Sequence, residues 1–155
     1  MEYLVMADIK TRLWKYEGDQ LYQTYKGYYR QGKYYPYKDS LGYLTVGAGH
    51  LVQKGEDFSN GITPIEADIL LAHDIEKAKA GLRTLNLGTL PKDIEDYLII
   101  MIFQLGLAGT SKFKKLLAAA KNGDRIGMRR ESIDSLWYKQ TKSRVDDMNN
   151  QLNWK

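Results

Sequence analysis

The sequence predicts an α+β fold, with strands near the N-terminus and helices in the rest of the chain. Residues 43–48 alternate in side-chain character, which is the period of a β-hairpin. The run Thr63–Glu66 combines an N-cap hydroxyl, a proline at the first helical position and a capping-box glutamate, so a long helix is predicted over 64–83. The nearly continuous apolar run 94–105 predicts a buried helix.

A short helix is predicted before these elements. Ile9, Leu13 and Tyr16 recur at roughly helical spacing, and Gly18 stands where a helix commonly stops. Glu17 is therefore expected at a helix end.

The later helices follow from periodicity and stop signals. Two or three further helices are predicted, over 111–121, 124–135 and 141–151, with Asn122–Gly123 as a clear stop. Trp137 is expected in the core. The helix predicted over 64–83 carries apolar residues that are expected to form its buried stripe: Ile65, Ile69, Ala72, Ile75 and Leu82.

Composition restricts the class of protein. The 155 residues are 43% hydrophobic and 27% charged, which suits one globular domain, residues 1–155, with room for two lobes. The absence of cysteine excludes disulfides, thiolate metal sites and cysteine nucleophiles. The glycines around Thr45 lack the lysine of a phosphate-binding loop, so nucleotide chemistry is unsupported. No cofactor and no metal are expected.

The formal net charge of +4 suits an acidic polymer as target and would equally suit nucleic acid. Its clearest cluster is the set Lys112, Lys114, Lys115 and Lys121. These lysines alternate with apolar residues as in an amphipathic helix, which favours a solvated helix face over a nucleic-acid interface. No nucleic-acid partner is expected.

Two carboxylates on separate local elements point to a reaction. Glu17 is followed by Gly18, and Asp39 lies in the run 37–50, at a strand or turn edge. Glycoside hydrolysis needs one protonated carboxyl group as acid and one ionised carboxylate across the cleft. Each residue alone is more commonly a solvated helix end or a polar turn. Their joint occurrence with Thr45 and the glycine spacing favours catalysis.

The run from Tyr37 to His50 carries every fixed position of the pattern Tyr-x-Asp-x-x-Gly-x-x-Thr-x-Gly-x-Gly-His. With Glu17–Gly18, it resembles the phage muramidases of the T-even lysozyme type, glycoside hydrolase family 24. The resemblance continues to Arg144 and covers nearly the whole chain. It implies a lysozyme-like fold: a β-containing lobe over about 17–62, a linking helix over about 64–83, and a helical lobe over about 92–155 packed with the N-terminal helix.

The resemblance also implies roles for single residues. Glu17 would be the general acid, Asp39 the second carboxylate, and Thr45 the hydroxyl that holds the attacking water for an inverting displacement. Arg144 resembles the family arginine that approaches the acid, and His50 with Asp74 resembles a structural pair. The residues expected to bind substrate are Phe103, Gln104, Tyr43 and Leu51.

One departure from the family is the longer spacing between Glu17 and Asp39. The extra residues are placed in 23–35, where 28–35 predicts a hairpin closing on a glycine-containing turn. Seven tyrosines crowd this part of the chain: Tyr22, Tyr25, Tyr28, Tyr29, Tyr34, Tyr35 and Tyr37. They either line an enlarged glycan cleft or cover a two-stranded ribbon, and the second alternative is favoured.

The resemblance implies hydrolysis of the β-1,4 bond between N-acetylmuramic acid and N-acetylglucosamine in bacterial peptidoglycan, by a monomer. A lytic transglycosylase acting on the same bond is one alternative, although Asp39 and Thr45 argue against it. A non-catalytic wall-binding or virion structural module is the other.

Delivery to the wall is a separate expectation. Residues 1–8 lack a basic region and an apolar stretch, so no cleavable signal peptide is expected, and no later segment is expected to insert into a membrane. The protein would be made in the host cytoplasm. A holin or another permeabilising partner, or a virion that carries the enzyme, would then bring it to the wall.

Overall fold

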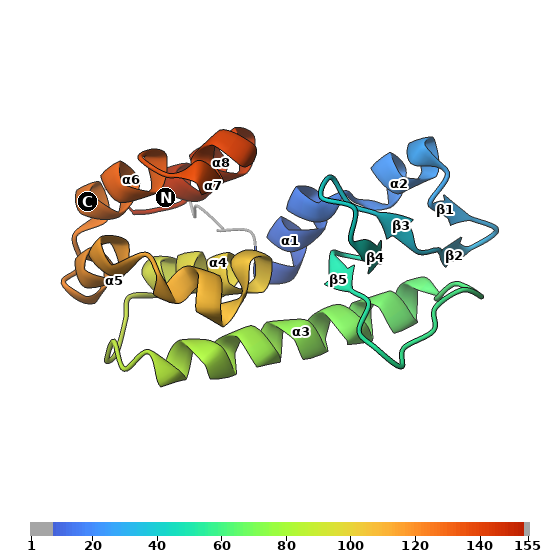
Figure 1. Cartoon of the computed structure of the whole chain (residues 1–155), viewed down its shortest axis with the longest axis horizontal. Helices are drawn as coiled ribbons and strands as arrows, with labels where there is room; N and C mark the ends of the chain where they lie inside the picture. The colour runs from blue at the N-terminus through green and yellow to red at the C-terminus, as the bar shows by residue number, and fades with distance from the viewer. Residues whose placement is uncertain (1–7, 154–155) are drawn as a thin grey trace, which may run out of the picture. The chain divides into compact units, whose positions relative to one another are not determined.

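The computed structural model describes residues 8–153 and divides into two compact units that meet in sequence between Ile75 and Glu76 (Figure 1). The strands within this range all belong to the first unit, and the second is helical in its regular structure. The predicted α+β class is confirmed. The expectation of no signal peptide falls on residues outside the described range and stays a prediction, as does the predicted packing of the N-terminal helix with the helical lobe.

The first unit begins with two short helices and continues with five short strands. These are α1 Ile9–Glu17, α2 Gln20–Lys26, β1 Tyr29–Arg30, β2 Lys33–Tyr34, β3 Tyr37–Lys38, β4 Leu44–Val46 and β5 His50–Leu51.

Helix α1 ends as predicted. The Asp8 side chain caps its start by accepting from Thr11 N at 2.8 Å. At the other end Gly18 has a φ of 103°, a backbone conformation that favours glycine and turns the chain after Glu17. Glu17 is therefore the last helical residue.

Helix α2 is not predicted by the sequence pattern, which assigns the extra residues to a loop and a hairpin. Asp19 caps its start through Tyr22 N, and Gly27 ends it in the left-handed conformation. The residue that it buries is the polar Gln23, whereas its large apolar residues Leu21 and Tyr25 are exposed. The helix therefore lacks the apolar stripe by which helices are recognised in sequences.

The predicted hairpin within the extra residues is confirmed as β1–β2. Its turn residues Gln31 and Gly32 both have positive φ, 52° and 76°, which is the twist that two-residue hairpins favour. Tyr34 pairs through both backbone groups with Ile62, at 2.7 and 2.8 Å. The hairpin is thus attached to the chain just before α3.

Strands β3, β4 and β5 form a separate antiparallel sheet with β4 in the middle. Thr45 pairs with Tyr37 on one side and with Leu51 on the other. The core beneath these elements contains Tyr34, Val46, Ile62 and Ala67, with partly buried residues around them.

Helix α3, Pro64–Thr84, has the predicted capping box. Thr63 N donates to Glu66 Oε1 at 2.9 Å, and Glu66 N donates to Thr63 Oγ1 at 3.2 Å. The predicted buried stripe is wrong at its start, because Ile65 and Ile69 are 75% and 62% exposed. The residues that α3 buries are Ala67, Leu71, Ile75, Ala78 and Leu82.

The second unit consists of the end of α3 and five further helices. These are α4 Lys92–Ser111, α5 Lys114–Lys121, α6 Arg125–Ile133, α7 Leu136–Gln140 and α8 Lys142–Asn150. Helix α7 is not predicted, because five residues are too few to show a period. Trp137, on α7, is buried as expected and meets the ring of Tyr97 edge-on.

Helix α4 is longer than predicted and breaks at Gly106, whose φ of 75° and ψ of 165° are not helical. Within residues 8–153, α4 is the helix whose length and composition would allow it to cross a membrane. Half of its most apolar stretch is buried inside the protein. Ile94, Leu98 and Ile100 are fully buried. Such burial is typical of the core helix of a globular unit.

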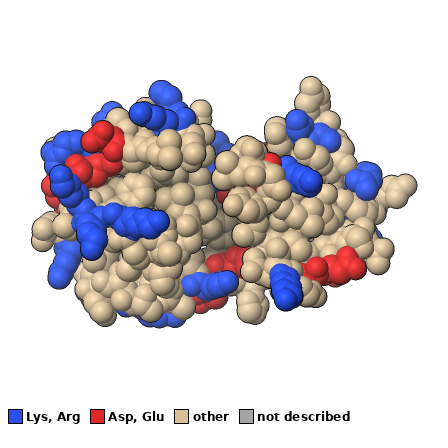
Figure 2. All heavy atoms as spheres, in the orientation of Figure 1, with Lys and Arg blue, Asp and Glu red and all other residues tan. Residues whose placement is uncertain are grey.

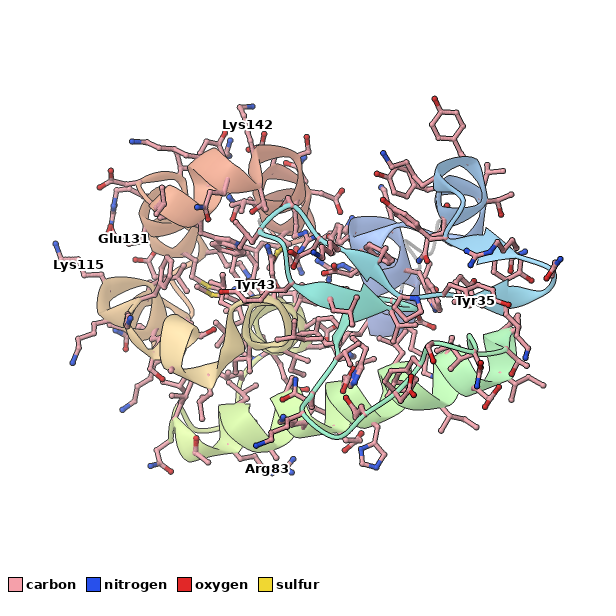
Figure 3. All side chains as sticks on the ribbon, turned by 45° about the vertical axis from the view of Figure 1, so that its right-hand side comes forward. Tyr35, Tyr43, Arg83, Lys115, Glu131 and Lys142 are labelled. Atoms are coloured by element: carbon pink, nitrogen blue, oxygen red, sulfur yellow. The ribbon has the colours of Figure 1, made fainter. Side chains whose placement is uncertain are left out.

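The predicted amphipathic character of the lysine-rich helix is present in α5. Leu116 and Ala120 are fully buried, and Lys115 is exposed and extends from the outer side of the helix (Figure 3). On the face drawn in Figure 2, Lys and Arg side chains are dispersed and have Asp and Glu among them. The lysines of α5 thus occupy the solvated face of a packed helix.

Candidate active site

The end of α1 brings the Glu17 side chain against the glycine-rich turn after β4. A Cβ atom on Gly49 would lie 2.6 Å from Glu17 Cγ and Cδ and 2.7 Å from Oε2. Only glycine leaves room for the carboxyl group at this point. The group in contact with Gly49 is therefore the Glu17 side chain.

A cavity of about 290 Å³ opens beside Glu17. Its lining is mostly polar and comes from the end of α1 and the start of α2: Lys15, Tyr16, Glu17, Gly18, Asp19 and Tyr22. The unpredicted helix α2 therefore contributes directly to the surroundings of the candidate acid.

Asp39 lies in the turn that follows β3, as the sequence predicts. Its Oδ1 atom accepts from Leu41 N and from Tyr43 N, both at 2.9 Å. These two bonds fix the carboxylate relative to the β3–β4 turn without help from any other element. One oxygen of Asp39 is thus held by the backbone.

Thr45 lies at the centre of the sheet and is 4% exposed. Its hydroxyl donates to the Tyr43 carbonyl at 3.1 Å. Because the hydroxyl proton is used within the hairpin, the oxygen can act toward another group only as an acceptor.

Tyr37 is a partly buried residue of the same sheet. It is the strand partner of Thr45, so the two side chains share one face of the sheet. Burial raises the pKa of Tyr37 most strongly, and the negative charges of Glu17 and Asp39 raise it further. Both carboxylates therefore lie within electrostatic reach of one neutral phenol. Sequence reasoning includes Tyr37 in the motif and gives it no role.

Gln23 ties the loop after α1 to the sheet. Its Nε2 donates to Gly18 O at 2.8 Å and to Gly47 O at 2.9 Å, and the residue is fully buried. This amide joins the chain next to Glu17 to the glycine-rich turn. A single glutamine in a polar helix gives no signal in the sequence from which these two hydrogen bonds could be predicted.

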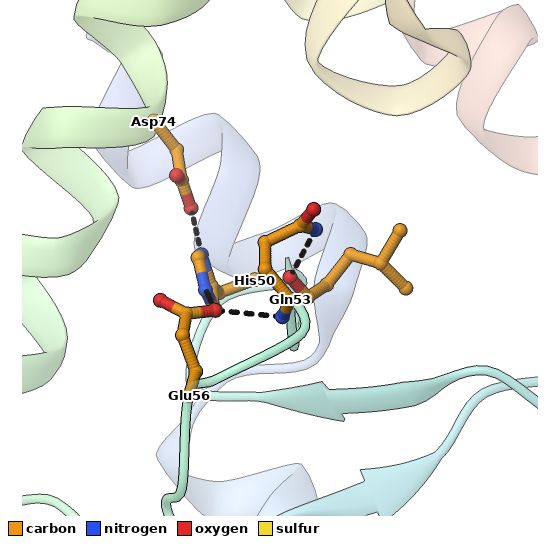
Figure 4. A network of polar contacts seen from close by, with 5 residues as sticks. His50, Gln53, Glu56 and Asp74 are labelled. Carbon is orange, nitrogen blue, oxygen red and sulfur yellow. Dashed lines mark hydrogen bonds and ion pairs between the residues drawn. The ribbon is translucent and has the colours of Figure 1, made fainter.

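The His50 side chain bridges two carboxylates at the edge of the sheet (Figure 4). Its Nδ1 lies 2.7 Å from Asp74 Oδ2, and its Nε2 lies 2.9 Å from Glu56 Oε1, which also accepts from Gln53 N. The sequence proposes the first pair and misses Glu56. The hydrogen bond to Asp74 is the main cause that raises the pKa of His50, with Glu56 adding to it and burial opposing it.

This network predicts a pH-dependent contribution to stability. Because folding raises the His50 pKa above 6.5, the contribution is complete below that pH and is lost as the pH rises through the folded-state pKa. We expect His50→Asn to be destabilised relative to wild type at about pH 5, with a smaller difference at about pH 9. Urea unfolding across this range measures it.

The matched control is His73→Asn, which removes the other histidine from an exposed position on α3. Because the His73 side chain is exposed, the free energy of unfolding of this variant is expected to stay near that of wild type at both pH values. A His50→Asn difference that is constant with pH would contradict the expectation.

The predicted substrate-binding residues fall into both units. Tyr43 and Leu51 lie in the first unit, 58% and 46% exposed, and Tyr43 is at the β3–β4 hairpin (Figure 3). Phe103 and Gln104 are half-buried on α4 of the second unit. Arg144 is half-buried on α8. The substrate-binding role of the four residues and the role of Arg144 beside the acid stay predictions.

The comparisons with known proteins agree with the resemblance seen in the sequence. The phage lysozyme family matches residues 29–151, and the chain belongs to this family of glycoside hydrolases. The match begins after Glu17, so it includes Asp39 and Thr45 but not the candidate acid.

A relative is the pre-baseplate central spike protein Gp5 of Enterobacteria phage T4. It is 29% identical over 134 residues, an alignment that covers 70% of this chain and 23% of the relative. The chain thus spans about a quarter of that relative's length.

Proposed function

We propose that this chain is a muramidase that hydrolyses the β-1,4 bond between N-acetylmuramic acid and N-acetylglucosamine in bacterial peptidoglycan, with inversion at the anomeric carbon. The observation that carries the proposal is that Tyr37 pairs with Thr45 across the sheet and has a pKa raised by burial and, further, by both Glu17 and Asp39. These observations support a site in the first unit to which the end of α1 supplies one carboxylate, while the β3–β4 hairpin supplies the other carboxylate and the hydroxyl.

The proposed reaction assigns one task to each group. The protonated carboxyl of Glu17 gives its proton to the glycosidic oxygen as the bond to the anomeric carbon breaks. Water attacks that carbon from the opposite face and loses its proton to Asp39. Thr45 Oγ1, whose own proton is held by Tyr43 O, accepts a hydrogen bond from this water and orients it. Solvent then returns a proton to Glu17 and removes one from Asp39.

The positions of the two carboxylates support this division of roles. The Glu17 side chain is packed against Gly49 at a helix end, whereas Asp39 is held by two backbone N–H groups in a turn. Two carboxyl groups in different surroundings are what acid and base roles require.

Analysis of the products tests the proposal. Digestion of purified peptidoglycan is expected to release fragments with reducing N-acetylmuramic acid ends, identified by mass spectrometry, and NMR of the first products is expected to show the α-anomer. Anhydro-muramic ends would assign the chain to the lytic transglycosylases. Initial products with retained configuration would reject the inverting mechanism, and no released fragments from a folded protein would favour a binding or structural module.

We also propose that the enzyme is carried by a virion. The support is the relative's name, which describes a central spike protein of a pre-baseplate. Mass spectrometry of purified phage particles is expected to detect this chain. Its presence only in the lysate, outside the particles, would favour the role of a free endolysin.

A further inference from the structure

We infer that Tyr22, on the short helix α2, forms the aromatic wall of a sugar-binding subsite beside Glu17. The inference rests on the proposed function and adds a residue that the family pattern does not contain.

The structure separates the clustered tyrosines by what their rings contact. Tyr28 stacks on Tyr37 at 4.3 Å between ring centroids, and Tyr29 packs against Tyr34 at 4.6 Å. The Arg30 guanidinium lies 3.8 Å above the ring of Tyr35. These five rings are engaged within the protein, in agreement with the predicted covering role. Among the seven clustered tyrosines, Tyr22 and Tyr25 are therefore the two candidates for contact with a ligand.

Tyr22 and Tyr25 are both exposed, at 51% and 87%, and lie on the same short helix. They differ in their surroundings. Tyr22 lines the 290 Å³ cavity together with Glu17, whereas Tyr25 is outside that lining. Of the two exposed rings, only Tyr22 is therefore beside the candidate acid.

The Tyr22 ring is held in place by the backbone next to Glu17. A Cβ atom on Gly18 would lie 2.7 Å from Tyr22 Cδ1, so the ring rests on the glycine. The Tyr22 N–H donates to Asp19 Oδ1 at 2.9 Å, and the next residue, Gln23, anchors α2 in the protein. An aromatic ring fixed in this way loses little conformational entropy when a ligand binds.

The lining of the cavity selects the class of ligand. A pyranose ring has faces of C–H groups and edges of hydroxyl groups, so it needs one flat apolar surface and several polar partners. Tyr22 provides the surface, and Lys15 and Asp19 provide polar groups around it. A wholly apolar ligand would leave these charges without partners. The subsite would therefore bind one sugar of the glycan strand next to the bond that is cleaved.

The test compares Tyr22→Ala with Tyr25→Ala, which removes an exposed ring from the same helix away from the cavity. With soluble peptidoglycan glycan strands as substrate, Tyr22→Ala is expected to raise KM about 10-fold and to leave kcat within about twofold, because stacking on the bound sugar is lost. Tyr25→Ala is expected to match wild type. Unchanged KM in a folded Tyr22→Ala would overturn the inference.

Two additions keep the result independent of folding and of the proposed function. Tyr22→Leu keeps apolar volume without a flat ring, and it is expected to raise KM as well if Tyr22→Ala does not fold. Calorimetric binding of the same strands to Glu17→Gln, with and without Tyr22→Ala, measures the subsite without turnover. Equal affinities would overturn the subsite alone, whereas a wild type that binds the strands and does not cleave them would overturn the proposed function alone.

Discussion

Glu17→Gln is expected to lower kcat for peptidoglycan hydrolysis by roughly 10²- to 10⁴-fold, the contribution typical of general acid catalysis. Glutamine has nearly the same shape as glutamate, so it fits against Gly49, but its amide cannot give a proton to the glycosidic oxygen. Turbidity loss of a cell-wall suspension and release of reducing ends both measure the effect. The melting temperature is expected to stay near that of wild type.

The matched control for this substitution is Asp8→Asn, which also replaces a carboxylate by an amide and lies at the other end of α1. Asparagine caps a helix about as well as aspartate, so α1 and the activity are expected to be unchanged. A Glu17→Gln enzyme as active as this control would show that the proton comes from another group.

Gly49→Ala is the second substitution with a large expected effect. An alanine methyl group would overlap the Glu17 carboxyl group, with three contacts of 2.6 to 2.7 Å. The glutamate side chain is flexible and would move, so the fold is kept while the acid is displaced. A displacement of about 1 Å can reduce the rate on the order of 10²-fold, and we expect kcat to fall by this amount.

Gly49→Ala also has a backbone cost, because the φ of Gly49 is +74°. This cost is about 1–2 kcal/mol in the free energy of unfolding. Gly32→Ala is the control, since Gly32 has a φ of +76° and a Cβ atom added there would meet nothing within 4 Å. Both variants are expected to lose similar stability, and only Gly49→Ala is expected to lose activity. Equal activities would contradict the proposed contact between residue 49 and the acid.

The sequence predicts those parts of the fold whose signals are local. Glycine after Glu17, the capping box at Thr63 and the turn at Gly32 each act within a few residues, and the structure confirms all three. Helix α2 escapes prediction because its contact with the protein is through the polar Gln23 rather than an apolar stripe. The apolar-stripe criterion also gives a wrong result at Ile65 and Ile69, because these residues are apolar but exposed.

For the site, the motif supplies the residue types and their order but not their surroundings. It places Asp39 in a turn, the family resemblance pairs His50 with Asp74, and the structure has both contacts. It cannot show that Glu17 lies against Gly49 or that Glu56 completes the histidine network, because these contacts depend on how separate elements come together. Sequence patterns record spacing along the chain, whereas such contacts depend on distances in space.

The two bonds of the Gln23 amide have a consequence for any shortened form of this chain. Removal of α2 from the chain would leave the carbonyl groups of Gly18 and Gly47 without this donor. A chain without α2 would need another donor for both carbonyl groups. Without such a donor, the chain after Glu17, the candidate acid, would be held less firmly to the glycine-rich turn.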